Sequence, residues 1–137
     1  MSLKEEAQAF RNLLDVPYPS IGLDLDGVID EAPIFFSILT KNWPGNVFII
    51  TFRDNKEKAE ELLKKHNISY KELILVNSFD DKAKVIKENG IGIYFDDQPE
   101  MLKQVSPMCT VMLVRNGGNF DFKDKKWMLS NQTGKIV

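Results

Sequence analysis

Five short apolar runs recur along the chain, and each is followed by polar or turn-forming residues. Runs of this length that are rich in Val, Ile, Leu and Phe are typical of strands buried on both faces of a parallel sheet. They predict a first strand that starts at residue 21 and four further strands over residues 47–51, 73–76, 92–95 and 109–114.

Amphipathic segments alternate with these runs and predict helices over 3–14, 33–41, 54–66, 82–88 and the stretch from Pro99 to Pro107. The helix over 33–41 is predicted to be mostly buried, with Phe35 and Phe36 in the core. Asp54, with Glu57 three residues on, is the predicted N-cap of the next helix. Alternating strands and helices indicate a three-layer, Rossmann-like α/β fold with right-handed crossovers.

Composition limits the class of protein further. The chain has 137 residues, 43% of them hydrophobic and 28% charged, which predicts one globular domain over 1–137. A net charge of −2 makes nucleic acid an unlikely partner, and no apolar run is long enough to cross a membrane. Cys109 is the single cysteine, which favours a reducing compartment, so we expect a cytoplasmic protein. We interpret Cys109 as a small core residue and His66 as a surface residue at a helix end.

An acidic pair follows the first apolar run: Asp24 and Asp26, separated by Leu25 and followed by Gly27. Alternation along a strand would direct both carboxylates to the same face. Two carboxylates about 4 Å apart repel by roughly 4 kcal/mol at an effective dielectric of 20, so the pair needs a proton, a cation or both. An EF-hand is excluded because its glycine belongs at the sixth loop position, whereas Gly27 is fourth from Asp24.

Other polar residues stand at strand ends or at a helix start. Thr51 ends the second predicted strand, Asp96 and Asp97 end the fourth, and Lys82 opens the helix that precedes the fourth strand. Ligands of parallel α/β sheets bind beyond the carboxyl ends of the strands, where the strand order reverses. If the first strand is central, all these side chains converge on one face of the molecule.

The order of these residues resembles the four motifs of the haloacid dehalogenase (HAD) superfamily of phosphohydrolases, over about residues 21–102. The resemblance implies a five-stranded parallel sheet of order 5-4-1-2-3, with the Asp-x-Asp strand in the middle. Lys82 is preferred to Lys84 as the lysine of the third motif because it stands at the helix start. The gaps after the first and second motifs are too short for a cap domain, so the resemblance is to small, capless members with an open site.

The same resemblance implies a magnesium-dependent phosphatase that hydrolyses a phosphomonoester. Asp24 is then the nucleophile and forms an aspartyl-phosphate. Asp26 protonates the leaving alcohol and later deprotonates the attacking water. Mg²⁺ is expected on the carboxylates of Asp24 and Asp97 and on the backbone carbonyl of Asp26.

Binding of the phosphoryl group is assigned by the resemblance to Thr51, Lys82 and Arg53, the last of which stands two residues after the threonine. Phosphoryl transfer requires positive charge around the phosphoryl oxygens. The four aspartates together with Lys82 sum to −3, which would repel a dianionic phosphate. A divalent cation and a proton are therefore expected in the site.

Other functions stay open at this point. A nucleotidase or polynucleotide phosphatase of the same fold needs an aromatic contact for the base, which the pattern does not locate. A non-catalytic phosphate- or protein-binding module could keep the fold, although it would not need both Asp24 and Asp26. The phosphorylated substrate is not identified by these motifs. Closure of the open site by residues 115–137 or by a second subunit of a homo-oligomer is also left open.

Overall fold

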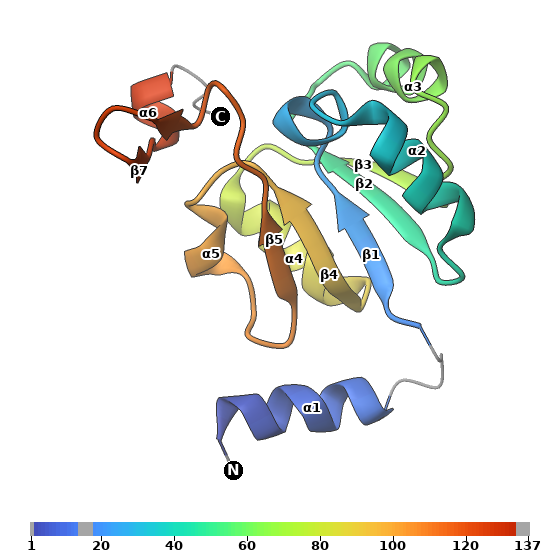
Figure 1. The fold of residues 1–137 in the computed structure, drawn as a ribbon. Coiled ribbons are helices and arrows are strands. Elements are labelled where there is room, and N and C mark those ends of the chain that lie inside the picture. Colours follow the sequence, from blue (N-terminus) through green and yellow to red (C-terminus); the bar gives the residue numbers. More distant parts are fainter. Residues whose placement is uncertain (1, 14–17, 134–137) are drawn as a thin grey trace.

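A five-stranded parallel sheet forms the middle layer of the molecule (Figure 1). In the computed structural model, residues 2–13 and 18–133 are described, with the side chains of 10–13 left out. The strand order β3-β2-β1-β4-β5 is the predicted order read from the other edge, and the Rossmann-like α/β class is confirmed. The strands are β1 (Ser20–Leu23), β2 (Val47–Thr51), β3 (Glu72–Leu75), β4 (Ile91–Asp96) and β5 (Thr110–Leu113).

The register of the sheet aligns the carboxyl ends of its central strands. Leu23 of β1 pairs with Ile49 of β2 on one side and with Phe95 of β4 on the other. The backbone N–H of Asp24 continues the ladder by donating to the carbonyl of Phe95 at 3.0 Å. The residues that follow β1, β2 and β4 therefore emerge at one edge of the sheet.

Helices cover the two faces of the sheet. Helices α2 (Pro33–Asn42) and α3 (Lys56–Lys65) pack on one face, and Phe36 and Leu63 enter the core there. Helices α4 (Phe79–Glu88) and α5 (Met101–Gln104) pack on the other face, around Ile86 and Met101. Figure 1 shows this three-layer arrangement. The remaining elements are α1 (Leu3–Leu13), the tight turn η1 (Leu25–Ile29), the short strands β6 (Phe120–Asp121) and β7 (Lys126–Trp127), and α6 (Ser130–Thr133).

Two predicted helix starts are wrong by a few residues. Helix α4 begins at Phe79 rather than Lys82, because the Ser78 side chain accepts a hydrogen bond from the backbone N–H of Asp81 at 3.0 Å and caps the helix earlier. The N-cap of α3 is Asn55 rather than Asp54, because the Asn55 side chain is the one that reaches an N–H of the first turn, that of Lys58, at 3.0 Å. A start three residues earlier places Lys82 inside the first turns of α4.

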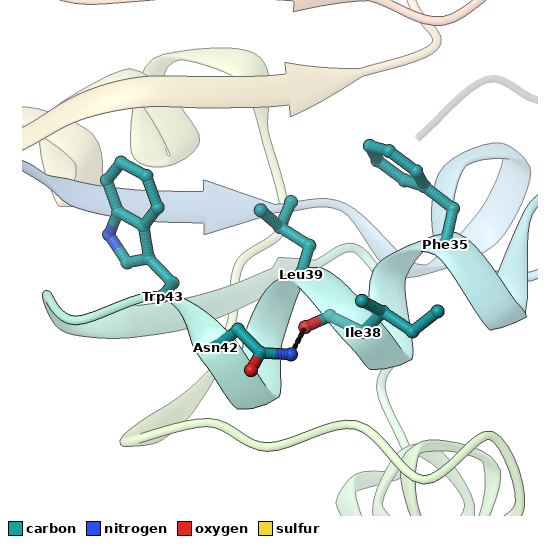
Figure 2. Close-up of a pocket in the computed structure, with 5 residues that line it drawn as sticks. All are labelled: Phe35, Ile38, Leu39, Asn42 and Trp43. Atoms are coloured by element: carbon teal, nitrogen blue, oxygen red, sulfur yellow. Dashed lines mark hydrogen bonds between the residues drawn. The ribbon is translucent and has the colours of Figure 1, made fainter.

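The predicted burial of α2 is also wrong. Phe36 is buried, but Ile34, Phe35 and Ile38 are 76%, 56% and 59% exposed. Figure 2 shows the groove of about 380 Å³ that this helix borders, lined by Phe35, Ile38, Leu39, Asn42 and Trp43. The helical period turns only one side of a mostly apolar segment toward the sheet, so the other side faces outward.

Smaller predictions have mixed outcomes. Cys109 is buried as expected, and His66 is the C-cap of α3. The predicted helix over 3–14 is present as α1, and its last residue, Leu14, lies outside the described residues. No helix in the described part of the chain is long and apolar enough to cross a membrane.

Candidate active site

Asp24 is held at the carboxyl end of β1, where the chain leaves the sheet. Its carboxylate accepts a hydrogen bond from the backbone N–H of Leu25 at 2.8 Å, and the residue is only 4% exposed. The chain then reverses at Gly27, whose φ of +79° is a left-handed conformation that favours glycine. A Cβ atom on Gly27 would also overlap the carboxylate of Asp97, so this position requires glycine for two reasons.

Lys82 is the cation at the centre of the site, and it is fully buried. Its ammonium lies 2.9 Å from Oδ2 of Asp96 and 3.4 Å from Oδ2 of Asp24. Burial by itself would lower the pKa of Lys82, but the attraction of Asp24 and Asp96 outweighs burial and raises the pKa. Lys84, the alternative for the third motif, is exposed and pairs with Glu88 at 3.8 Å. These contacts place Lys82, and not Lys84, beside Asp24.

Asp96 orients Lys82. One of its carboxylate oxygens accepts hydrogen bonds from Lys82 and from the hydroxyl of Tyr94, at 2.9 and 2.8 Å. The other oxygen accepts from the backbone N–H of Gln98 at 2.8 Å. Three donors around one buried carboxylate leave it little capacity for a further partner, so Asp96 is best suited to positioning the lysine.

Asp97 belongs to the same cluster and is contacted by the chain that follows β5. The Asn116 amide donates to the backbone carbonyl of Gly27 at 3.0 Å and lies 3.4 Å from Oδ2 of Asp97. The Asn119 amide donates to the backbone carbonyl of Asp97 at 2.6 Å. Both asparagines are buried. Neither was predicted, although their position just after the fifth strand is where a sheet-edge residue is expected.

Carboxylate oxygens of Asp24, Asp96 and Asp97 lie within 4.8 Å of one another. Burial raises the pKa of Asp24 well above its usual range; Lys82 opposes this effect, and the charges of Asp96 and Asp97 add to it. Such a group of buried oxygen donors fits a hard divalent cation such as Mg²⁺. The assignment of Asp24 and Asp97 as the carboxylates that hold this ion stays a prediction.

Asp26 departs from the expected geometry. It lies inside the turn η1 rather than on the strand, and its side chain is 48% exposed while Asp24 is buried. The strand ends at Leu23, so strand alternation does not direct the two carboxylates to one face. The side chain of Asp26 is not part of the three-carboxylate cluster. The backbone carbonyl of Asp26 as a metal ligand stays a prediction.

Arg53 forms a two-pronged ion pair with Asp26. Its Nε and Nη2 atoms donate to the two carboxylate oxygens at 2.9 and 2.8 Å, and these hydrogen bonds are the largest cause of the raised pKa of Arg53. Arg53 was predicted to bind the phosphoryl group. In this structure it is engaged by Asp26, at the exposed rim of the site.

Thr51 ends β2, as predicted, and is buried. Its hydroxyl accepts a hydrogen bond from the backbone N–H of Arg53 at 3.2 Å and keeps its own proton to donate. The ring of Phe52, the residue between Thr51 and Arg53 in the sequence, packs against α4. Its centroid is 4.3 Å from the Lys82 ammonium and 5.4 Å from the Phe79 ring. Phe52 therefore shields the lysine from solvent on this side.

A scan of protein-family models finds no match to this chain. Searches of curated proteins and of solved structures find no match either.

Proposed function

We propose that this protein is a magnesium-dependent phosphatase of the HAD type, without a cap domain, which hydrolyses a phosphomonoester through an aspartyl-phosphate. The observation that supports this proposal most is the position of Lys82, buried between Asp24 and Asp96, whose carboxylate oxygens lie within 4.8 Å of one of Asp97. A buried ammonium shared by two carboxylates, with a third alongside, suits a site built for a divalent cation and a phosphate. A structural core gains little from such a cluster, because desolvation of the charges offsets their attraction.

Asp24 is the proposed nucleophile. One of its carboxylate oxygens attacks phosphorus, and the P–O bond to the leaving alcohol breaks. The positive charge of Lys82 reduces the repulsion between the Asp24 carboxylate and the phosphate during the attack. The hydroxyl of Thr51 donates a hydrogen bond to a phosphoryl oxygen. Bound Mg²⁺, held by Asp24 and Asp97, would supply charge neutralisation on the phosphoryl oxygens.

Asp26 is the proposed acid and base. It lies at the exposed rim, where the leaving alcohol departs and the attacking water enters. It gives its proton to the leaving oxygen in the first step. In the second it takes a proton from the water that attacks phosphorus, while the bond between phosphorus and the Asp24 oxygen breaks and inorganic phosphate leaves. Both carboxylate oxygens are engaged by Arg53, so at least one of these hydrogen bonds must open during turnover.

The function is tested by release of inorganic phosphate from a panel of phosphomonoesters, with Mg²⁺ and after chelation. We expect hydrolysis only with the metal, and a loss of at least about a thousandfold in Asp24→Asn. Because burial raises the pKa of Asp24, its charge lowers the stability of the metal-free fold near neutral pH, and Asp24→Asn should remain folded. Substantial turnover by a folded Asp24→Asn protein, or full activity without metal, would contradict the proposal.

A further inference from the structure

The segment after β5 carries a cluster of aromatic rings capped by an arginine. The Arg115 guanidinium lies 5.0 Å from the ring centroids of both Phe120 and Phe122. Phe120 makes edge contacts with Phe122, at 5.1 Å, and with Trp127 across the β6–β7 hairpin, at 5.3 Å. These four side chains are called the aromatic platform below.

The platform is anchored beside the candidate active site. Arg115 directly precedes Asn116, whose amide contacts Gly27 and Asp97. Phe120 directly follows Asn119, whose amide donates to the backbone carbonyl of Asp97. Arg115 and Phe120 are each one residue away from an asparagine that makes these contacts, and consecutive Cα atoms are only about 3.8 Å apart. The segment that carries the platform therefore lies beside the acidic site, and Figure 1 shows it leaving the sheet at the end of β5.

The platform is available to a ligand. Phe122 is 58% exposed, and Arg115 lies on the surface above the rings. Among the described residues, the rings of Phe120, Phe122 and Trp127 make ring and cation contacts only with one another and with Arg115. Residues 115–127 hold four cationic and two acidic side chains, a net charge of +2 in a chain of net charge −2. An anionic ligand is therefore attracted to this segment.

We propose that the aromatic platform binds the base of a nucleotide whose phosphate occupies the acidic site. Bases stack on aromatic rings and on the guanidinium plane of arginine, largely irrespective of sequence. The platform lies beside the phosphate site and not within it, and in a nucleotide the sugar separates the base from the phosphate. In phosphotyrosine the ring is bonded directly to the ester oxygen, so its ring would stay within the acidic site. The phosphate end of this proposal rests on the proposed phosphatase function, whereas stacking of the base does not.

The kinetic test compares a nucleoside 5′-monophosphate with ribose 5-phosphate, which lacks the base. We expect kcat/KM of the wild-type protein to favour the nucleotide by roughly tenfold or more, and the ratio to fall to about one in Phe122→Ala. The matched control is Phe35→Ala, since Phe35 is 56% exposed on α2 and is not part of the platform, and we expect it to leave the ratio unchanged. A wild-type ratio near one, a ratio in Phe122→Ala that equals the wild-type ratio, or a preference for phosphotyrosine would overturn the proposal.

A binding test separates the platform from catalysis. In a Trp43→Phe background, Trp127 is the single tryptophan, and we expect adenosine without phosphate to quench its fluorescence, less so after Phe122→Ala. Quenching in a protein that hydrolyses no phosphomonoester would overturn the phosphatase function and keep the platform. Hydrolysis of phosphomonoesters without any quenching would keep the phosphatase function and overturn the platform.

Discussion

At the scale of the residue, Lys82 is the side chain that connects the other residues of the site. It is fully buried, its ammonium neutralises charge on Asp24 and Asp96, and the ring of Phe52 covers it. A buried cation is stable only while its acidic partners are present, and the partners depend on the cation in the same way. Stability and proposed catalysis therefore both depend on this one lysine.

Replacing Lys82 should accordingly cost stability as well as activity. We expect Lys82→Ala to lower the free energy of unfolding by about 3 to 5 kcal/mol, because it leaves buried carboxylates without their cation. Lys84→Ala is the control: its ion pair with Glu88 is exposed and should contribute less than about 1 kcal/mol. Denaturant unfolding measures both. Equal losses for the two variants would contradict the placement of Lys82 in the third motif.

Arg53 and Asp26 lead to a prediction about leaving groups. In Arg53→Ala, the Asp26 carboxylate loses both hydrogen bonds that hold it at the rim. We expect kcat/KM to fall by about ten- to hundredfold for alkyl phosphates, whose leaving oxygen needs a proton, and less for aryl phosphates. Lys56→Ala, which removes an exposed cation nearby on α3, is the control. The same loss for both substrate types would show that Arg53 acts on phosphate binding and not through Asp26.

At the scale of the element, the turn η1 and the segment 115–119 hold each other in place. Gly27 lies where the two meet, and its carbonyl accepts the Asn116 amide. The backbone N–H of Gly27 also donates to the Asp30 side chain at 2.7 Å, so Asp30 closes the turn and does not cap α2. Asp26 is thus positioned by a loop, whereas the backbone of Asp24 still continues the ladder of β1.

Gly27→Ala should disrupt this junction. Its positive φ disfavours a Cβ atom, and that atom would overlap the Asp97 carboxylate. We expect a loss of about 2 kcal/mol or more in the free energy of unfolding, with loss of activity. Gly117→Ala is the matched control in the facing segment, since nothing lies within 4 Å of its added Cβ and no positive φ is recorded. A thermal melt in which both variants behave alike would show that η1 tolerates a side chain.

At the scale of the whole molecule, the sheet brings charge of one sign to one edge. The carboxylates of Asp24, Asp96 and Asp97 gather at the ends of two neighbouring strands, and the buried ammonium of Lys82 pairs with Asp24 and Asp96. The excess of negative charge at this edge is offset when a divalent cation binds. The metal should therefore stabilise the folded protein as well as support catalysis.

Addition of Mg²⁺ should therefore raise the melting temperature. At a concentration a hundred times the dissociation constant, we expect a gain of about 2.7 kcal/mol, or about 5 to 10 °C. The rise should be smaller in Asp97→Asn and unchanged in Asp54→Asn, an exposed aspartate outside the cluster. Sodium chloride at matched ionic strength controls for screening. A rise of equal size in Asp97→Asn would remove Asp97 from the metal site.

Much of this arrangement follows from the sequence alone. The periods of the apolar runs determine which segments are strands and which are helices, and strictly alternating strands and helices favour a parallel sheet. Since parallel strands end at one edge, Asp24, Thr51, Asp96 and Asp97 are brought to the same side, with Lys82 facing them. The identity of the buried residues in this site was therefore largely predictable.

The partners of those residues were decided by the tertiary structure. Asn116 meets Gly27 across 89 positions of the chain, and Arg53 meets Asp26 across 27. The exposure of the outward side of α2 and the assembly of the aromatic platform also depend on how the elements pack. Local periodicity determines which element a residue belongs to, because it reflects short-range geometry. Which distant side chains meet depends on packing of the whole chain, since each contact requires several elements to be placed at once.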